Sequence, residues 1–215
     1  VVVRWMSNLP AWGRPDAKSM LVVGFGGGLI VEAVPPNCEK IDVVEIESEM
    51  IAASERIAGS RRTDPLSDPR LELIVNDARG ALLLTEERYD AILSQPSHPW
   101  TAGSSHLYTR EFFQLVRDHL TEDGVFVQWM GLGFIDEALF KTLLVTLQDV
   151  FAHVRVYRPS PGGLLFTASP MPFEPERLAR TTLDLVPAGA SEVGVRSGAD
   201  IVAHMLLDDE ASRSF

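Results

Sequence analysis

Glycines at alternate positions follow a short apolar run near the start of the chain. The segment Leu21–Gly28 predicts a buried strand that turns sharply at Gly24, Gly26 and Gly28 and then enters a short helix. Glycine lets a ligand approach the peptide plane closely, and free N–H groups at the start of a helix attract anionic groups. We therefore interpret this loop as a nucleotide- or nucleoside-binding turn. A turn that binds nothing is the alternative, because Leu29 stands where the dinucleotide fingerprint has a small residue.

Two carboxylates are spaced to contact a nucleoside on that loop. Glu45 ends a second apolar run, 21 residues beyond Gly24 (45 − 24). A carboxylate there can accept hydrogen bonds from both ribose hydroxyls, and it repels the 2′-phosphate of NADP. Asp77 follows a third apolar run, where it can accept a hydrogen bond from the adenine amine, cap the next helix, or do both. The alternative for Glu45 is a solvated strand end, a role that we assign to its neighbour Glu47.

A parallel sheet must position these residues, because apolar runs of strand length alternate with amphipathic runs of helix length. The pattern predicts an α/β protein with a Rossmann-like, doubly wound, mostly parallel sheet of seven strands that closes with an antiparallel hairpin. The strands are predicted at 20–23, 41–46, 71–75, 89–94, 125–129, 154–157 and 164–167. Helices are predicted near 29–34, 49–58, 79–84, 110–120 and 137–150, with Ser48, Thr109 and Asp136 as caps of the second, fourth and fifth.

We divide the chain into three parts. They are an N-terminal segment at 1–18, a nucleotide-binding Rossmann-like domain at 19–168 and a C-terminal helical extension at 169–215. Trp5 and Trp12 are predicted to pack the N-terminal segment. The pattern is weaker in the extension, where we predict helices near 174–181 and 199–207 that cover one edge of the sheet.

The composition is that of an ordinary globular protein and argues against several classes of function. The chain has 215 residues, is 46% hydrophobic and has a formal net charge of −11. Its 19 basic residues are scattered, whereas nucleic-acid binding needs clustered ones. The single cysteine, Cys38, cannot form a disulfide within the chain, and no residues have the spacing of a metal site. No apolar run approaches the ~20 residues of a membrane helix, so we expect a cytoplasmic domain that meets a membrane only through segments outside this chain.

Six short segments together carry a resemblance to a known family: Gly24–Gly28, Val44–Glu47, Asn76–Asp77, Tyr89–Ile92, Leu107–Phe112 and Asp123–Phe126. In this order they resemble the spermidine/spermine synthase family, which has the class I S-adenosylmethionine-dependent methyltransferase fold. The resemblance implies a cofactor that is S-adenosylmethionine or decarboxylated S-adenosylmethionine. It also implies that Glu45 binds the ribose, that Asp77 reaches the adenine, and that the loop after the fourth strand covers the active site.

That loop departs from the family pattern. The family's aminopropyltransferases carry Asp-Ser-Ser-Asp-Pro there, and Gln95 and His98 stand in place of the two aspartates. Gly27 likewise stands where they carry an acidic residue. Aminopropyl transfer needs a deprotonated amine, which a carboxylate assists and a glutamine amide does not, so the departures argue against ordinary polyamine synthesis. The segment Ser94–Gly103 resembles instead a bacterial branch of spermidine-synthase-like proteins, some fused to membrane segments, which has Glu in place of Gln95 and Asn in place of His98.

The loop, predicted over 95–106, retains side chains that can do chemistry. His98 and His106 titrate near neutrality and are candidate bases, and the alternative for each is a hydrogen bond within the loop. Trp100 can lie over a cationic sulfonium or anchor the loop by packing. We assign His98 and Gln95 to the catalytic site, and Ser94 and Trp100 to the cofactor site.

We predict a transferase that binds S-adenosylmethionine or its decarboxylated form and moves a methyl or aminopropyl group to a small acceptor, for which an amine is one candidate. Gln128 and Trp129, at the end of the fifth strand, are candidates for the rim of its pocket. The alternative is a non-catalytic nucleoside-binding or sensing domain of a larger protein. An NAD-dependent oxidoreductase is disfavoured by Leu29 and Asp77. We expect no nucleic-acid partner and leave a homodimer open.

Overall fold

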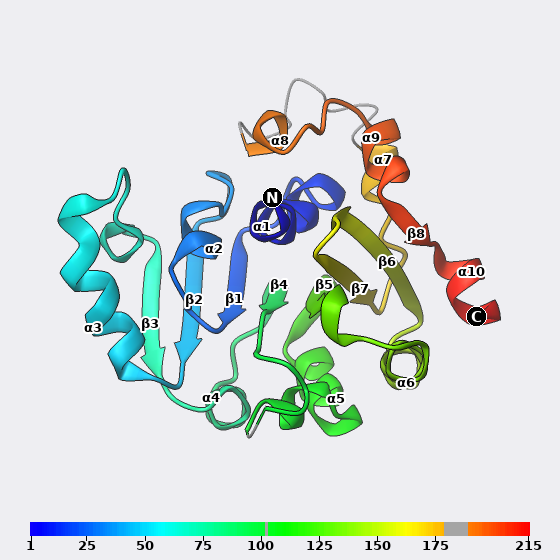
Figure 1. Cartoon of the computed structure of the whole chain (residues 1–215), viewed down its shortest axis with the longest axis horizontal. Helices are drawn as coiled ribbons and strands as arrows, with labels where there is room; N and C mark the ends of the chain where they lie inside the picture. Colours follow the sequence, from blue (N-terminus) through cyan, green and yellow to red (C-terminus); the bar gives the residue numbers. More distant parts are fainter. Residues whose placement is uncertain (102, 179–188) are drawn as a thin grey trace.

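One sheet organises the fold. The computed structural model describes residues 1–101, 103–178 and 189–215. Its strands are β1 Ser19–Val23, β2 Lys40–Glu45, β3 Leu71–Val75, β4 Tyr89–Ser94, β5 Leu120–Gly131, β6 His153–Ser160, β7 Gly163–Ser169 and β8 Met205–Leu207. They form a single sheet in the order β3-β2-β1-β4-β5-β7-β6-β8 (Figure 1). The strands β1 to β5 pair in parallel, and β7, β6 and β8 continue the sheet in antiparallel pairs.

This topology confirms the predicted Rossmann-like fold and its closing antiparallel hairpin, but the predicted count of seven strands is wrong by one. The sequence predicts helix up to residue 207, whereas the helix α9 (Gly198–Ala203) ends early and β8 follows it. β8 pairs with the outer edge of β6, with Leu207 opposite Val156 and Met205 opposite Tyr157. An open strand edge carries unpaired backbone N–H and C=O groups, and pairing with them overrides the local preference for helix.

Helices cover both faces of the sheet. On one face α1 (Val2–Gly13) packs through buried aromatic and aliphatic side chains, and on the other α4 (Ala78–Leu84), α5 (Arg110–Asp118) and α6 (Glu137–Gln148) form a second core. None of the helices in the described part of the chain combines the length and hydropathy of a transmembrane span. The other elements are α2 Leu29–Glu32, α3 Ser48–Ile57, α7 Pro175–Leu178, α8 Gly189–Glu192, α10 Asp209–Ser214, η1 Ala58–Ser60, η2 Pro65–Ser67, η3 Ser104–Tyr108 and η4 Leu132–Phe134.

The helix α1 lies in the core rather than beside it. Trp5 is fully buried and meets Trp12 edge to face, with ring centroids 4.9 Å apart. Ser7 donates a hydrogen bond to the carbonyl of Ile30, and Asn8 donates one to the carbonyl of Ala33. The core of the Rossmann-like unit therefore extends into residues 1–18, and α1 supports the helix that follows the glycine loop.

Two of the three predicted helix caps are confirmed. The Thr109 hydroxyl accepts a hydrogen bond from the amide of Phe112, and the Asp136 carboxylate accepts one at 2.8 Å from the amide of Leu139. The predicted Ser48 cap is wrong, because the extended residue before α3 is Glu47 and Ser48 is already helical. In the extension, α7 covers part of the helix predicted at 174–181, and positions 179–181 lie outside the described residues.

The C-terminal segment runs along β6 at the outer edge of the sheet (Figure 1), and a partly buried ion cluster holds it there. Arg155, in β6, is only 6% exposed. Its guanidinium donates to Glu176 at 2.7 Å and lies 3.4 Å from carboxylate oxygens of both Glu174 and Asp209. His153 contacts the same oxygen of Asp209 at 3.2 Å. One arginine thus fastens α7 and α10 to the same strand.

Candidate functional site

The chain reverses its direction of strand addition between β1 and β4, and open α/β sheets bind ligands in the crevice at that switch point, beyond the carboxyl ends of the strands. Val23 pairs with Val44 on one side and with Ser94 on the other. The glycine loop, the end of β2 and the loop after β4 therefore meet at this edge, where the arrowheads of β1 and β2 point (Figure 1).

The glycine loop has a backbone that other residues rarely adopt. Gly24, Gly26 and Gly28 have φ angles of 92°, 52° and 77°. An added Cβ at Gly26 would meet nothing within 4 Å, whereas one at Gly28 would lie 2.4 Å from Cγ of Pro65. The loop therefore needs glycine at its inner end for close packing and leaves open space at its outer turn, as a ligand-binding turn requires.

Gly28→Ala is expected to destabilise the chain by about 1–3 kcal/mol, because a positive φ is strained for alanine and the added Cβ would overlap Pro65. Gly27→Ala is the matched control: its φ is not in the left-handed region, and its Cβ would lie 4.0 Å from the nearest atom, Nη2 of Arg61. Urea denaturation of both variants measures the difference. Equal stability of the two would mean that the loop conformation is not the one described.

Glu45 reaches from the end of β2 into the glycine loop. It is 7% exposed, and its Oε2 accepts hydrogen bonds from the amides of Phe25 at 2.8 Å and Gly26 at 3.3 Å. Its Oε1 accepts one at 2.9 Å from the amide of Glu47, whose own side chain is exposed. The interpretation of Glu45 as a solvated strand end is therefore wrong. A carboxylate offers about four acceptor positions, so one position stays available beside these three bonds, and the contact with a ribose stays a prediction.

Asp77 lies on the neighbouring strand end, since Glu45 pairs with Val75 in the β2–β3 ladder. Its Oδ2 accepts a hydrogen bond at 2.9 Å from the amide of Gly80, so it caps α4. Its Oδ1 has no hydrogen-bond partner within residues 1–101, 103–178 and 189–215. Asp77 therefore has the predicted capping role. Its contact with adenine stays a prediction, for which Oδ1 is the available acceptor.

The start of the loop after β4 is packed against the glycine loop. The backbone N–H of Gln95 donates a hydrogen bond to the carbonyl of Val23 at 3.3 Å. The backbone carbonyl oxygen of Gln95 lies 3.6 Å from the position that a Cβ at Gly24 would occupy. Ser94 precedes it and is completely buried, with Gln128 of β5 as its register partner. Gln95 and Ser94 therefore reach the same edge as the glycines.

The side chain of Gln128 is completely buried in the absence of a ligand, and its place at the rim of the pocket stays a prediction. Its amide nitrogen donates to the carbonyl of Trp129 at 3.1 Å. The side-chain carbonyl of Gln128 and the hydroxyl of Ser94 have no partner in the described part of the chain. Buried polar atoms normally find partners, so this pair marks a place for a water or a polar ligand group. A glutamine inside an otherwise apolar strand was the only sequence signal for it.

Aromatic side chains of the loop after β4 and of β5 form a cluster. The ring of His98 stacks on Trp100 with centroids 5.0 Å apart and lies 6.1 Å from the ring of Trp129. Trp100 is 58% exposed. The hydroxyl of Tyr108 donates to the carbonyl of Ser97, and burial raises the pKa of this phenol above its ordinary value. The cluster brings together His98 and Trp100 of the sequence prediction.

His106, the other candidate base, does not join the cluster. His106 lies exposed in η3, and its carbonyl accepts a hydrogen bond from Thr109. Cys38 is buried, and burial raises the pKa of its thiol to about 11, so it is a poor nucleophile at neutral pH. Across the described residues, no group of three or more His, Cys, Asp or Glu side chains is placed to hold a metal ion.

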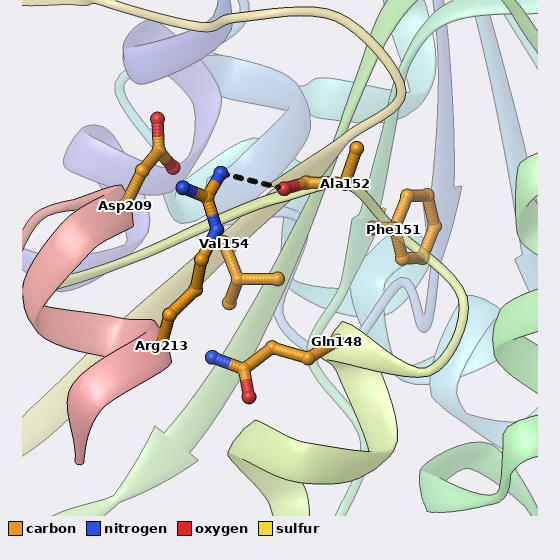
Figure 2. A pocket seen from close by; sticks show the side chains of 6 residues that line it. All are labelled: Gln148, Phe151, Ala152, Val154, Asp209 and Arg213. Atoms are coloured by element: carbon orange, nitrogen blue, oxygen red, sulfur yellow. Dashed lines mark hydrogen bonds between the residues drawn. The ribbon is translucent and has the colours of Figure 1, made fainter.

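A separate pocket of about 240 Å³ lies away from this edge, between α6, β6 and α10 (Figure 2). Arg213 crosses it and donates a hydrogen bond to the carbonyl of Ala152 at 3.2 Å. The strands β5 and β7 stand between β6 and the β1–β4 crevice, so we do not count this pocket as part of the candidate site. It is lined by Gln148, Phe151, Ala152, Val154, Asp209 and Arg213.

The strand order, the glycine loop after β1 and the acidic end of β2 define the class I methyltransferase fold, which is Rossmann-like. A solved spermidine synthase in complex with the transition state analogue AdoDATO superposes with a TM-score of 0.82, at 23% identity, over 99% of this chain and 74% of that one. Human methyltransferase-like protein 13 in complex with SAH has a TM-score of 0.61, at 22% identity, over 80% of each chain.

The chain belongs to the spermine/spermidine synthase family, because the model of the spermine/spermidine synthase domain matches residues 1–159. Among curated relatives, a polyamine aminopropyltransferase of Synechococcus sp. (strain JA-2-3B'a(2-13)) is 32% identical over 175 residues, which is 75% of this chain and 56% of the relative. The chain thus spans about half the length of the curated relatives it matches.

Proposed function

We propose that the chain is a transferase that binds S-adenosylmethionine or decarboxylated S-adenosylmethionine and moves a methyl or aminopropyl group to a small acceptor. The observation that carries this proposal is the buried Glu45 carboxylate, which is bonded to the amides of Phe25 and Gly26 at the β1–β4 crevice. The Synechococcus relative is a polyamine aminopropyltransferase, which supports an amine as the acceptor. A homodimer stays a prediction.

The residues divide the work between binding and proton transfer. Glu45 and the open glycine loop hold the nucleoside, Asp77 faces the adenine, and Trp100 lies beside the reacting carbon. The bound cofactor supplies an alkyl group on a sulfonium. The carbon–sulfur bond of the sulfonium would supply the leaving group for an attacking nucleophile, and His98 would accept the proton that the nucleophile loses. Positioning the reactants supplies most of the acceleration.

A ligand panel tests the binding half of the proposal. S-adenosylmethionine, its decarboxylated form, methylthioadenosine and NAD are each added during thermal unfolding. A ligand at 100 times its Kd stabilises the folded chain by about 2.7 kcal/mol. We expect the adenosyl sulfur compounds to raise the Tm more than NAD does. A larger shift with NAD would contradict the proposal.

Turnover is tested through His98. His98→Gln is expected to lower kcat by about 10²–10⁴-fold, the range that a general base contributes, while binding of methylthioadenosine stays unchanged. His106→Gln, on the exposed part of the same loop, is the matched control. If both variants turn over as fast as the unaltered chain, His98 is not the base.

Nucleoside binding without turnover is the second candidate function. It is favoured by the composition of the loop, since no acidic residue stands between Asp90 and Glu111 to hold a cationic acceptor. This reading expects the nucleosides to bind while no amine in a panel is alkylated. Gln95→Asp separates the two functions: a gain of alkylation favours the transferase, and continued binding with zero turnover favours the binding domain.

A further inference from the structure

Arg61 lies against the glycine loop, although it is far from the loop in sequence. It follows η1 in the connection between α3 and β3. Its Nη2 donates a hydrogen bond to the carbonyl of Gly27, and its Nη1 donates one at 3.1 Å to the hydroxyl of Ser54, which is buried in α3. The guanidinium is therefore fixed in place beside the loop from two sides.

The charge of this guanidinium is not neutralised by the protein. Both of its acceptors are neutral oxygens, and no carboxylate in the described part of the chain forms an ion pair with it. Arg70 and Arg155, by comparison, have carboxylate partners. A guanidinium has five N–H donors in a planar fork that matches a carboxylate, and these two bonds use only part of them.

The guanidinium also stands where a ligand would pass. Glu45 fixes the sugar site at Phe25 and Gly26, and the next peptide along the loop is that of Gly27. An added Cβ at Gly26 would meet nothing within 4 Å, and at Gly27 the nearest atom would be Nη2 of Arg61, at 4.0 Å. A substituent on the 5′ side of the sugar that follows the loop therefore crosses open space and reaches the guanidinium.

We propose that Arg61 selects a nucleoside whose 5′ substituent carries an anionic group, and that this group is the carboxylate of an amino-acid tail. S-adenosylmethionine and S-adenosylhomocysteine have that carboxylate. Decarboxylated S-adenosylmethionine has only cationic groups on its tail, which the arginine repels. The inference rests on the proposed function and, within it, favours methyl transfer over aminopropyl transfer. A pyrophosphate would satisfy the same arginine, and the experiment separates the two.

Calorimetric titration of the whole chain tests the selection. The unaltered chain is expected to bind S-adenosylhomocysteine and S-adenosylmethionine about tenfold more tightly than methylthioadenosine, which has no charged tail, and decarboxylated S-adenosylmethionine more weakly still. Tenfold corresponds to about 1.4 kcal/mol. Arg61→Gln is expected to remove this preference, and Arg61→Lys, which keeps the charge, is expected to retain part of it. Arg62→Gln, at the exposed neighbour, is the control and should change nothing.

The comparison among ligands separates selection from a structural role. If Arg61→Gln weakens methylthioadenosine and S-adenosylhomocysteine by the same factor, Arg61 only braces the loop and the inference is wrong. The inference is also wrong if the unaltered chain binds decarboxylated S-adenosylmethionine more tightly than S-adenosylmethionine. If it binds NAD more tightly than S-adenosylmethionine, the arginine is assigned to a pyrophosphate. If methylthioadenosine binds as tightly as S-adenosylhomocysteine to the unaltered chain, the inference about Arg61 is wrong while the proposed function stands. If no adenosyl compound binds, the proposed function fails with it.

Discussion

Glu45→Gln is expected to weaken binding of S-adenosylhomocysteine about a hundredfold, which is about 2.7 kcal/mol. The carboxylate holds the loop amides of Phe25 and Gly26 with one oxygen and the amide of Glu47 with the other. In glutamine one of these oxygens becomes an NH₂ group, which faces an N–H donor. The ribose then loses a charge-assisted acceptor, and each hydrogen bond to a charged group contributes about 1.5–3 kcal/mol.

Calorimetry measures this loss, and urea denaturation shows whether the variant is still folded, because a buried donor facing a donor also costs about 1–3 kcal/mol of stability. Glu47→Gln is the matched control: it removes the same charge two residues away, from an exposed side chain, and is expected to leave affinity unchanged. A folded Glu45→Gln chain that binds as tightly as the Glu47→Gln chain would show that the sugar does not lie on Glu45.

The residues of the glycine loop and the end of β2 could be predicted because their signals are local. Consecutive apolar residues followed by glycines predict a strand and a turn wherever they stand, and the strands predicted at 71–75 and 89–94 have the observed bounds. The position of Glu45 at the end of an apolar run was sufficient to place it at the crevice. These features depend on backbone geometry and on burial over a few residues.

The remaining features depend on contacts between distant positions. Arg61 contacts a residue 34 positions away, and Arg155 contacts Asp209 across 54 positions. Neither arginine has a spacing to its partner that a periodic pattern would reveal. The strand β8 likewise forms because the edge of β6 is open beside it. Sequence patterns report local preference, and these three features arise from tertiary contacts that override it.

Arg155→Met is expected to destabilise the chain by about 3–5 kcal/mol, the usual cost of removing one partner from a buried ion pair. Methionine leaves Glu176 without its guanidinium partner, whereas Glu174 keeps Arg177 and Asp209 keeps His153. Urea denaturation measures the loss. Arg158→Met is the matched control, because Arg158 lies on the same strand with an exposed side chain and is expected to change stability by less than about 0.5 kcal/mol.

The double variant Arg155→Met with Glu176→Gln distinguishes lost charge pairing from lost packing. Removing the partner at the shortest distance as well should restore part of the stability, since one uncompensated and partly buried carboxylate disappears. Hydrogen exchange locates the effect: because α7 and α10 are fastened to β6 by this arginine, the amides of β8 should lose protection before those of β5. If the single variant is as stable as Arg158→Met, or if protection falls uniformly over the sheet, Arg155 is not what holds the C-terminal segment to the strand.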